Sequence, residues 1–249
     1  KGFKTGKISA ADLEELTDDL FEEAKRVRQK EPVLQNLLNV TVLADDGEVE
    51  RSLANAIAHT VCYRLLLKRC NPPPSTMMTM AASNDNSEPP VFCPHTLHHL
   101  FLEAFADSSI LEYGHTMLEA VLEDVQAVVR RDPAMDTTLQ VILYSKGFAA
   151  LVCHRAAHRL HQKEQIYTAL YLQSMCSSVF GVDIHPRATI GKGVMLDHGT
   201  GVVIGETAEI DDDVTIYHGV TLGGTTWKAG KRHPTLNDNV VIGAGAKVL

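Results

Sequence analysis

The amino-acid sequence predicts an α+β protein, with an all-helical part over residues 1–180 followed by a left-handed parallel β-helix of hexapeptide repeats over residues 181–249. Three observations predict this class. Apolar residues recur at helical spacing up to about residue 180. Beyond that point the helical period vanishes, and Gly, Val, Ile and Asp dominate. Apolar residues then recur at every sixth position, which is typical of a β-helix.

The predicted helices carry start and stop signals. Ser9 or Asp12 is expected to cap the first helix, and Pro32 is expected in the first turn of the second. Asp132 precedes Pro133, and a residue before proline avoids helical dihedral angles, so a helix ends there. In chain order, helices are expected over residues 13–24, 32–43 and 49–69, from about 96, and over 109–130, 137–162 and 164–179.

Residues 71–91 differ in composition from the rest of the helical part. They contain three consecutive prolines, a further Pro-Pro pair and several Ser, Asn and Met residues. This composition favours a flexible surface insertion between helices. Nothing in its sequence indicates a function.

The six-residue repeat defines the second part. A six-residue period fits neither a 3.6-residue helix nor an alternating strand, so each repeat is expected to form one short strand and one corner. Eight extra residues, 226–233, interrupt the repeat, and an insertion in a solenoid indicates a surface loop with a binding role. The chain ends within a coil, so we expect the natural protein to continue. The apolar positions are Ile184, Ile190, Leu196, Val202, Ala208, Val214 and Val220, then Pro234, Val240 and Ala246.

Composition excludes several classes of function. The formal net charge is -8, which argues against nonspecific nucleic-acid binding because that requires a basic face. No window of about 18 apolar residues occurs, so no membrane-spanning helix is predicted. The first residues carry no apolar stretch behind their charges, so no signal peptide is expected there. Five scattered cysteines without a CxxC pair favour reduced thiols, and hence a cytoplasmic protein.

Histidine and aspartate gather in the repeats. Asp197 and His198 follow an inward Leu196, so we expect them at an accessible corner. Asp183 lies fifteen residues before His198, close to one coil, which suggests that the two side chains stack. A carboxylate beside a histidine is the usual arrangement for a general base. Because Asp, His and Gly are also common in solvated turns, the spacing alone leaves the catalytic interpretation open.

Several stretches together resemble the serine acetyltransferase family. They are VDIHP at 182–186, MLDHGTG at 195–201, VTLGGT at 220–225 and RHP at 232–234. Upstream, RDPA at 131–134 and YSKGF at 144–148 are also similar to that family. The resemblance covers about residues 110–249 well and the first helices loosely. Hexapeptide repeats alone indicate only a broad acyltransferase superfamily, but these motifs together indicate a much smaller group of proteins.

The resemblance implies a reaction. Acetyl-CoA would be the co-substrate, without a metal, and its acetyl group would pass to the hydroxyl of L-serine, the first step of cysteine biosynthesis. His198 would be the general base, and Asp183 would orient it. No Cys or Ser with a neighbouring base occurs in the motifs, so direct attack is favoured over an acyl-enzyme.

The resemblance also implies binding residues. Asp132 and Asp197 would hold the amino group of serine. Arg232 would hold the carboxylate, which a planar guanidinium suits, and His233 would line the same pocket. The backbone at Gly223, Gly224 and Thr225 would lie against the pantetheine arm of the coenzyme.

The family resemblance implies partners as well. Members similar to this chain form trimers with active sites between neighbours, and pairs of trimers associate through the helical part, so a homotrimer or hexamer is expected. Cysteine is the expected feedback inhibitor. The family binds O-acetylserine sulfhydrylase through a C-terminal tail, an association not expected of a chain that ends at Leu249.

Two alternatives remain open at this stage. The first is a hexapeptide enzyme that acetylates another acceptor, although Asp132 with Arg232 favours an amino acid. A metal enzyme similar to γ-carbonic anhydrases would need three histidines on one ion, for which His185, His198 and His218 are candidates. The histidines at 95–99 are followed by no fourth ligand pattern and are not interpreted as metal ligands. Those at 154–161 are interpreted as a helix face at a subunit contact rather than a zinc site. Trp227, in the inserted loop, either covers the cofactor or shields the loop.

Overall fold

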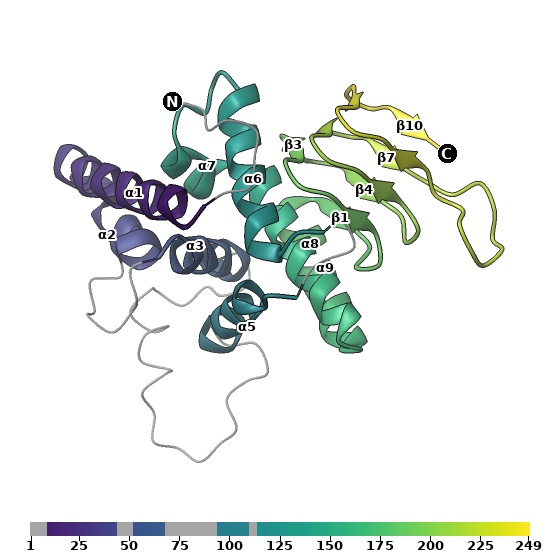
Figure 1. The fold of residues 1–249 in the computed structure, drawn as a ribbon, viewed down its shortest axis with the longest axis horizontal. Helices are drawn as coiled ribbons and strands as arrows, with labels where there is room; N and C mark the ends of the chain where they lie inside the picture. Colours follow the sequence, from purple (N-terminus) through teal and green to yellow (C-terminus); the bar gives the residue numbers. More distant parts are fainter. Residues whose placement is uncertain (1–8, 44–51, 68–93, 110–113) are drawn as a thin grey trace, which may run out of the picture.

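The computed structural model describes residues 9–43, 52–67, 94–109 and 114–249, so the predicted insertion at 71–91 lies outside the described residues. Helices fill the described chain up to residue 180, and short strands follow from residue 182 (Figure 1). Within the described ranges, none of the helices combines the length and apolar character that crossing a bilayer requires. The helices are α1 (Ala10–Lys30), η1 (Pro32–Leu34), α2 (Gln35–Leu38), η2 (Asn39–Leu43), α3 (Leu53–Leu67), α5 (Pro94–Ala106), α6 (Met117–Arg131), α7 (Thr138–Tyr144), α8 (Lys146–Gln162) and α9 (Ile166–Phe180).

The start of α1 confirms the predicted cap. The Ser9 hydroxyl accepts the backbone N–H of Asp12 at 3.2 Å, and the Asp12 carboxylate accepts the backbone N–H of Ser9 at 2.8 Å. This reciprocal pair is a capping box, which satisfies two amides that the helix itself leaves unpaired. Leu16, Leu20 and Ala24 then recur at helical spacing and are buried.

Two predicted helices are not continuous. The one predicted over residues 32–43 begins as a 3-10 turn at Pro32 and ends as the π-helical turn η2. The one predicted over residues 137–162 is divided into α7 and α8 at Ser145, which takes an extended conformation. Ser145 ends α7 and caps α8, because its hydroxyl accepts the backbone N–H of Phe148. The break turns α8 toward the first coil of strands.

The strands form a three-sided parallel solenoid. Its sides are sheet A (β1, β4, β7 and β10), sheet B (β2, β5 and β8) and sheet C (β3, β6 and β9), and the chain visits them in turn. In Figure 1 the strands of sheet A lie side by side toward the C-terminus, and α8 and α9 lie against the first coil. The strands are β1 (Val182–Ile184), β2 (Thr189–Ile190), β3 (Met195–Asp197), β4 (Val202–Ile204), β5 (Glu209–Ile210), β6 (Thr215–Tyr217), β7 (Thr221–Leu222), β8 (Thr235–Leu236), β9 (Val241–Ile242) and β10 (Lys247–Val248).

The strand register corrects the predicted repeat at one point. Ile184 pairs with Ile204, so the first coil has twenty residues rather than eighteen. The two extra residues lie between Leu196 and Ile204, in the corner that contains His198. The prediction of equal six-residue steps is therefore wrong there. The eight-residue insertion is confirmed, because Glu209 pairs with Thr235, twenty-six residues later.

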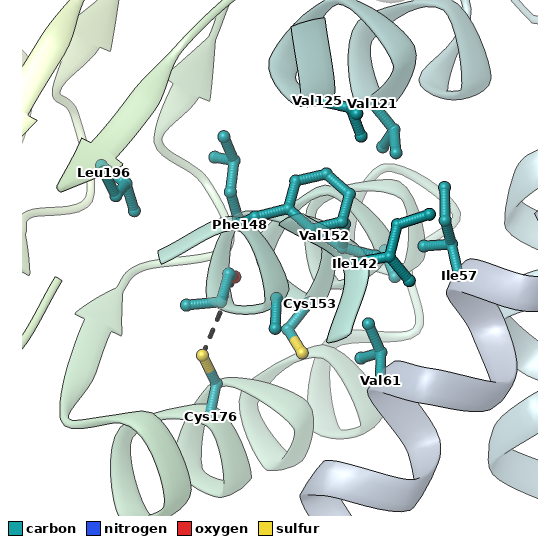
Figure 2. Packing of buried hydrophobic residues seen from close by; sticks show 14 of the residues in the cluster. Ile57, Val61, Val121, Val125, Ile142, Phe148, Val152, Cys153, Cys176 and Leu196 are labelled. Carbon is teal, nitrogen blue, oxygen red and sulfur yellow. Dashed lines mark hydrogen bonds between the residues drawn. The ribbon is translucent and has the colours of Figure 1, made fainter. Parts of the chain in front are cut away.

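The helices and the solenoid share one apolar core. Phe148 and Val152 of α8 lie between the helices and β3, with Val121 and Val125 of α6 on one side and Leu196 on the other (Figure 2). All of these side chains are almost fully buried. Core packing therefore holds α8 against the strand that leads to His198.

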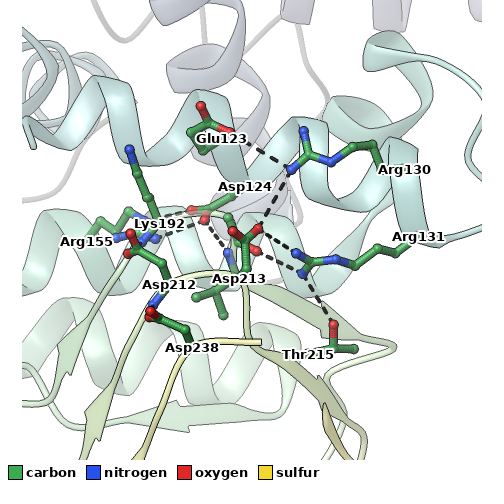
Figure 3. A network of polar contacts seen from close by, with 12 residues as sticks. Glu123, Asp124, Arg130, Arg131, Arg155, Lys192, Asp212, Asp213, Thr215 and Asp238 are labelled. Carbon is green, nitrogen blue, oxygen red and sulfur yellow. Dashed lines mark hydrogen bonds and ion pairs between the residues drawn. The ribbon is translucent and has the colours of Figure 1, made fainter. Parts of the chain in front are cut away.

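A buried ion pair ties the same elements together (Figure 3). Arg155 of α8 binds both oxygens of Asp124 of α6 at 2.7 and 3.0 Å, and each side chain is at most 2% exposed. Arg155 also donates to the carbonyls of Ile190 and Gly191, and Asp124 accepts the backbone N–H of Val194. Because both charges are paired and hydrogen-bonded, they fix the helices on the β2–β3 corner of the first coil.

Candidate active site

The predicted site residues lie mainly on two corners of the solenoid. Asp197 and His198 lie on the β3–β4 corner, between sheets C and A. Arg232 and His233 end the inserted loop and contact the β4–β5 corner, between sheets A and B. Strand β4, three residues long, separates these corners by roughly 10 Å of extended chain. Within one chain, the structure therefore forms two groups of candidate residues.

His198 has an unusual backbone. Its φ of 56° is left-handed, a conformation that few residues other than glycine adopt and that often marks functional sites. A tight turn produces it, because the Gly199 and Thr200 amides donate to the carbonyls of Asp197 and His198 at 2.6 and 2.8 Å. The turn is made by the two extra residues of the first coil. It leaves the His198 side chain 74% exposed.

The neighbours of His198 are Asp197 and His218. The Asp197 carboxylate lies 3.7 Å from Nε2 of His198, and the His218 ring lies edge-on with its centroid 5.8 Å away. His218 comes from the equivalent corner of the next coil. The ion pairs of the described residues join His198 to Asp197 and not to Asp183. Asp183 instead accepts a hydrogen bond of 2.7 Å from the Gln173 amide of α9, and its predicted role toward His198 stays a prediction.

The first turn of α8 supports the β3–β4 corner. A Cβ on Gly147 would lie 1.8 Å from the carbonyl oxygen of Leu196, so only glycine allows the helix to approach β3 this closely. Lys146 also donates to the Thr200 hydroxyl. The positive end of α8 thus lies beside the turn that contains His198.

Arg232 binds an acidic residue of the β4–β5 corner. Its guanidinium donates to the Glu206 carboxylate at 2.5 Å, and Arg187 donates to the other oxygen of Glu206 at 2.6 Å. These hydrogen bonds, above all that from Arg232, hold the pKa of Glu206 below its usual range. Two cations around one carboxylate leave a net positive charge, which suits an anionic ligand.

His233 is held against the same corner. Its Nδ1 lies 3.1 Å from the backbone nitrogen of Thr207 and 2.9 Å from the Thr207 hydroxyl. Its ring lies against Gly205, where an added Cβ would come within 2.0 Å of ring atoms. Burial, followed by the charge of Arg232, lowers the pKa of His233. The neutral imidazole is therefore favoured.

The glycines predicted to meet the coenzyme lie at the start of the inserted loop. Gly223 donates its backbone N–H to the carbonyl of Val248 at 2.8 Å, and an added Cβ would meet the Leu249 side chain at 2.7 Å. At Gly224 an added Cβ would lie 3.2 Å from the Arg232 carbonyl oxygen. Thr225 is exposed. At Gly224 the packing of this chain leaves little room for a side chain, and the contact of these residues with pantetheine stays a prediction.

Asp132 comes from the helical part rather than from a corner of the solenoid. It ends α6, and its carboxylate accepts the backbone N–H of Ala134 at 2.9 Å. The preceding Arg131 donates to the Gly193 carbonyl at 2.9 Å and to Asp213 at 2.6 Å (Figure 3). These bonds fix the end of α6 on the solenoid. Its predicted contact with an amino group stays a prediction.

A cavity lies beside some of these residues, and a larger one lies away from them. One of about 420 Å³ is lined by Glu206, Thr207, Arg187 and residues of α8, beside the Arg232–His233 pair. A larger one of about 850 Å³ lies between α1 and α6 and includes none of the predicted site residues. Among the described residues, no group of three His, Cys, Asp or Glu side chains is arranged to hold a metal ion. His185, His198 and His218 are therefore not clustered as three metal ligands would be.

Comparisons with known proteins place this geometry in a family. The family model described as "Serine acetyltransferase, N-terminal" matches residues 77–153. Serine acetyltransferase 1, chloroplastic, of Arabidopsis thaliana is 40% identical over 230 residues, 92% of this chain and 63% of the relative. The serine acetyltransferase of Buchnera aphidicola is 36% identical over 236 residues, 94% of this chain and 78% of the relative. The chain belongs to the serine acetyltransferase family.

Solved structures agree with this assignment. The serine acetyltransferase of Neisseria gonorrhoeae in complex with serine is 35% identical, with a TM-score of 0.75 over 93% of this chain and 81% of that one. The enzyme of Brucella abortus in complex with coenzyme A is 35% identical, with a TM-score of 0.74 over 96% of this chain and 83% of that one. The chain spans less than two thirds of the length of the Arabidopsis relative.

Glu206 and Thr207 contact the Arg232–His233 pair, although the sequence motifs predicted no role for either residue. A signal for them exists in the sequence. With the eight-residue insertion counted, residues twenty-six apart lie in neighbouring coils, as Glu209 and Thr235 show. The same offset joins Glu206 to Arg232 and Thr207 to His233. The motifs of the serine acetyltransferase family therefore contact one another through the strand register.

Proposed function

We propose that this chain transfers the acetyl group of acetyl-CoA to the hydroxyl of L-serine, giving O-acetyl-L-serine and coenzyme A, as the first step of cysteine biosynthesis. Family membership supports the reaction, and solved relatives in complex with serine and with coenzyme A support the two substrates. The observation that carries the mechanism is the left-handed turn at His198, which presents an exposed imidazole beside a carboxylate.

His198 acts as the general base in this proposal. Its imidazole takes the proton of the serine hydroxyl while the oxygen attacks the thioester carbonyl. The tetrahedral intermediate then collapses, the C–S bond breaks, and the thiolate of coenzyme A leaves and takes up a proton. Asp183 has the role of orienting His198, a role that calls for Asp183 to leave Gln173.

The serine zwitterion is held at its two charged ends. Arg232 and His233 hold its carboxylate, where the two guanidinium groups around Glu206 leave a positive charge. Asp132 and Asp197 hold its ammonium group. Orientation of this kind supplies much of the rate acceleration of a two-substrate reaction. The reason is that both reactants lose their translational freedom before the chemical step.

Direct transfer fits the cysteines that the structure describes. Cys62, Cys153 and Cys176 are free and buried, and burial raises the pKa of the Cys62 and Cys153 thiols. A buried thiol that stays protonated is a poor nucleophile. These residues therefore do not favour a covalent acetyl-enzyme.

Assembly completes the site in this proposal. His198 and Arg232 lie on different corners of one chain, so the left-handed solenoid is proposed to form a trimer in which one corner faces the other corner of a neighbour. Two trimers then associate through their helices into a hexamer. Inhibition by cysteine would act at the serine pocket, and association with O-acetylserine sulfhydrylase would use a C-terminal tail.

A direct assay tests this function. Purified protein is incubated with acetyl-CoA and a panel of serine, other hydroxy amino acids and sugars, and release of the coenzyme A thiol is followed. We expect turnover with L-serine and O-acetyl-L-serine as its product by mass spectrometry. Turnover with a sugar or another amino acid but none with serine would overturn the acceptor assignment.

A further inference from the structure

We propose that Thr207 is a positioning residue of the acceptor site, which holds the Arg232–His233 pair in place and fixes His233 as the tautomer whose Nε2 carries the proton. This inference rests on the proposed function and deepens it. It gives the inserted loop, residues 226–233, a specific anchor in the neighbouring coil.

The Thr207 hydroxyl first fixes the backbone of the pair. Its oxygen accepts the backbone N–H of Arg232 at 3.0 Å and the backbone N–H of His233 at 3.1 Å. Both amides lie at the end of a loop with eight more residues than the repeat requires. Without this acceptor, each of the two partly buried amides would lose its hydrogen bond, and the loop offers no replacement acceptor. One hydroxyl therefore sets the position of two binding side chains.

The remaining proton of the hydroxyl then determines the tautomer. A threonine hydroxyl has one donor and two acceptor lone pairs. Because both lone pairs serve amides, the O–H is left to donate to Nδ1 of His233, 2.9 Å away. The backbone N–H of Thr207 also points at Nδ1, at 3.1 Å. Two donors facing Nδ1 require it to be an acceptor, so the ring proton is on Nε2.

The position of the ring gives this proton a use. The ring lies on Gly205, and an added Cβ at Gly224 would lie 3.3 Å from Nε2 of His233. The Nε2–H group is therefore held next to the loop predicted to bind acetyl-CoA. A neutral ring with a fixed donor suits a substrate carboxylate or a developing oxyanion. The lowered pKa of His233, caused first by burial, favours the same neutral form.

Three variants separate positioning from general stability. Thr207→Val keeps the shape and removes the hydroxyl, and Thr207→Ser keeps the hydroxyl. Thr235→Val is the matched control, because the hydroxyl of that exposed threonine donates to Glu209 in the neighbouring coil. For each variant, KM for serine, kcat and the Kd of coenzyme A alone are measured.

We expect Thr207→Val to raise KM for serine by about tenfold or more, since two amides lose their acceptor. The Kd of coenzyme A should stay within about twofold, and Thr207→Ser and Thr235→Val should remain close to the starting protein. An unchanged KM in a folded Thr207→Val variant, or an equal loss in Thr207→Ser, would overturn the proposal.

A second measurement needs neither a variant of Thr207 nor a substrate. Imidazole nitrogen chemical shifts of ¹⁵N-histidine-labelled protein near neutral pH report the tautomer of each ring, and His233→Gln assigns the signal. We expect Nε2 of His233 to carry the proton, and a protonated Nδ1 would contradict the inference. If the protein does not acetylate serine but shows this tautomer, the proposed function fails while the anchoring by Thr207 stands.

Discussion

At the scale of single residues, His198 combines an exposed imidazole with a left-handed backbone. The conformation arises because the first coil contains two residues more than the repeat, and the turn that absorbs them ends at Gly201. The strain is offset by the hydrogen bonds of the turn and by the helix α8 packed against it. An accessible base on a rigid support is the arrangement that general base catalysis requires.

His198→Ala tests this assignment. We expect kcat to fall by about 10²–10⁴-fold, the usual contribution of a general base, with little change in the Kd of coenzyme A. Steady-state assays with serine and acetyl-CoA measure the effect. His99→Ala is the matched control, since His99 is an exposed histidine of α5 paired with Glu103. A variant that keeps near-normal turnover would remove His198 from the mechanism.

Sequence motifs were sufficient to select His198, Asp197 and the Arg232–His233 pair as candidates. They were not sufficient to find Glu206 and Thr207, because these residues lie twenty-six positions before Arg232 and His233 in the sequence. Those two become visible only when the register is counted across the insertion. The partner of Asp183 was not predictable either, since Gln173 belongs to a helix whose direction depends on packing.

At the scale of elements, the break at Ser145 has more effect on the position of α8 than the lengths of the helices have. The sequence predicts one helix over residues 137–162, because its apolar period continues through the break. Local periodicity does not report that Gly147 must touch β3. The slip between Leu196 and Ile204 was missed for a related reason: Val202, two residues before Ile204, is also apolar and buried, so the six-residue series appears unbroken.

Gly147→Ala tests the contact between α8 and β3. The added methyl group would overlap the Leu196 carbonyl oxygen, so we expect the free energy of unfolding to fall by about 1–3 kcal/mol and activity to fall with it. Urea unfolding measures the first effect. Gly243→Ala is the control, because nothing lies within 4 Å of an added Cβ there. Equal stability of the two variants would show that α8 can move without cost.

At the scale of the whole molecule, helices and solenoid behave as one packed body. The sequence separates them at residue 180, where the periodicity changes, and the helix-to-strand change does occur there. Their mutual orientation was not predictable, because it depends on the Asp124–Arg155 pair and on long-range apolar contacts. The helical side of that interface is a mixed apolar and charged surface that no motif marks.

Acid stability should distinguish the partly exposed carboxylate of Asp107 from the buried carboxylate of Asp124. Bonds from Lys163, then Ser109 and Arg159, hold the pKa of Asp107 well below its usual range. Its contribution to stability is complete above the unfolded pKa of 3.8 and is lost as pH falls through the folded value. Burial, opposed by Arg155, raises the pKa of Asp124 to about 6. Its contribution therefore declines as pH rises from about 4 to about 6, and acid does not remove it.

We therefore expect Asp107→Asn to flatten the loss of unfolding free energy below about pH 4, whereas Asp124→Asn should leave that acid limb in place. Urea unfolding at a series of pH values measures both. The exposed pair of Glu22 and Lys25 supplies the control, because Glu22→Gln removes an ion pair that contributes little. An acid limb that is unchanged in Asp107→Asn would contradict the assignment.

Both departures from the six-residue repeat, the two extra residues near His198 and the eight-residue insertion, lie in corners of the solenoid. The strands on either side stay in register, as the pairs Ile184 with Ile204 and Ile210 with Leu236 show. The part of the proposed acceptor site that the inserted loop supplies can therefore change without a change in the scaffold. The segment from Gly223 to Pro234 forms an exchangeable loop between β7 and β8. A loop of different length grafted in its place should change which acceptor is used, while the coils above and below remain stacked.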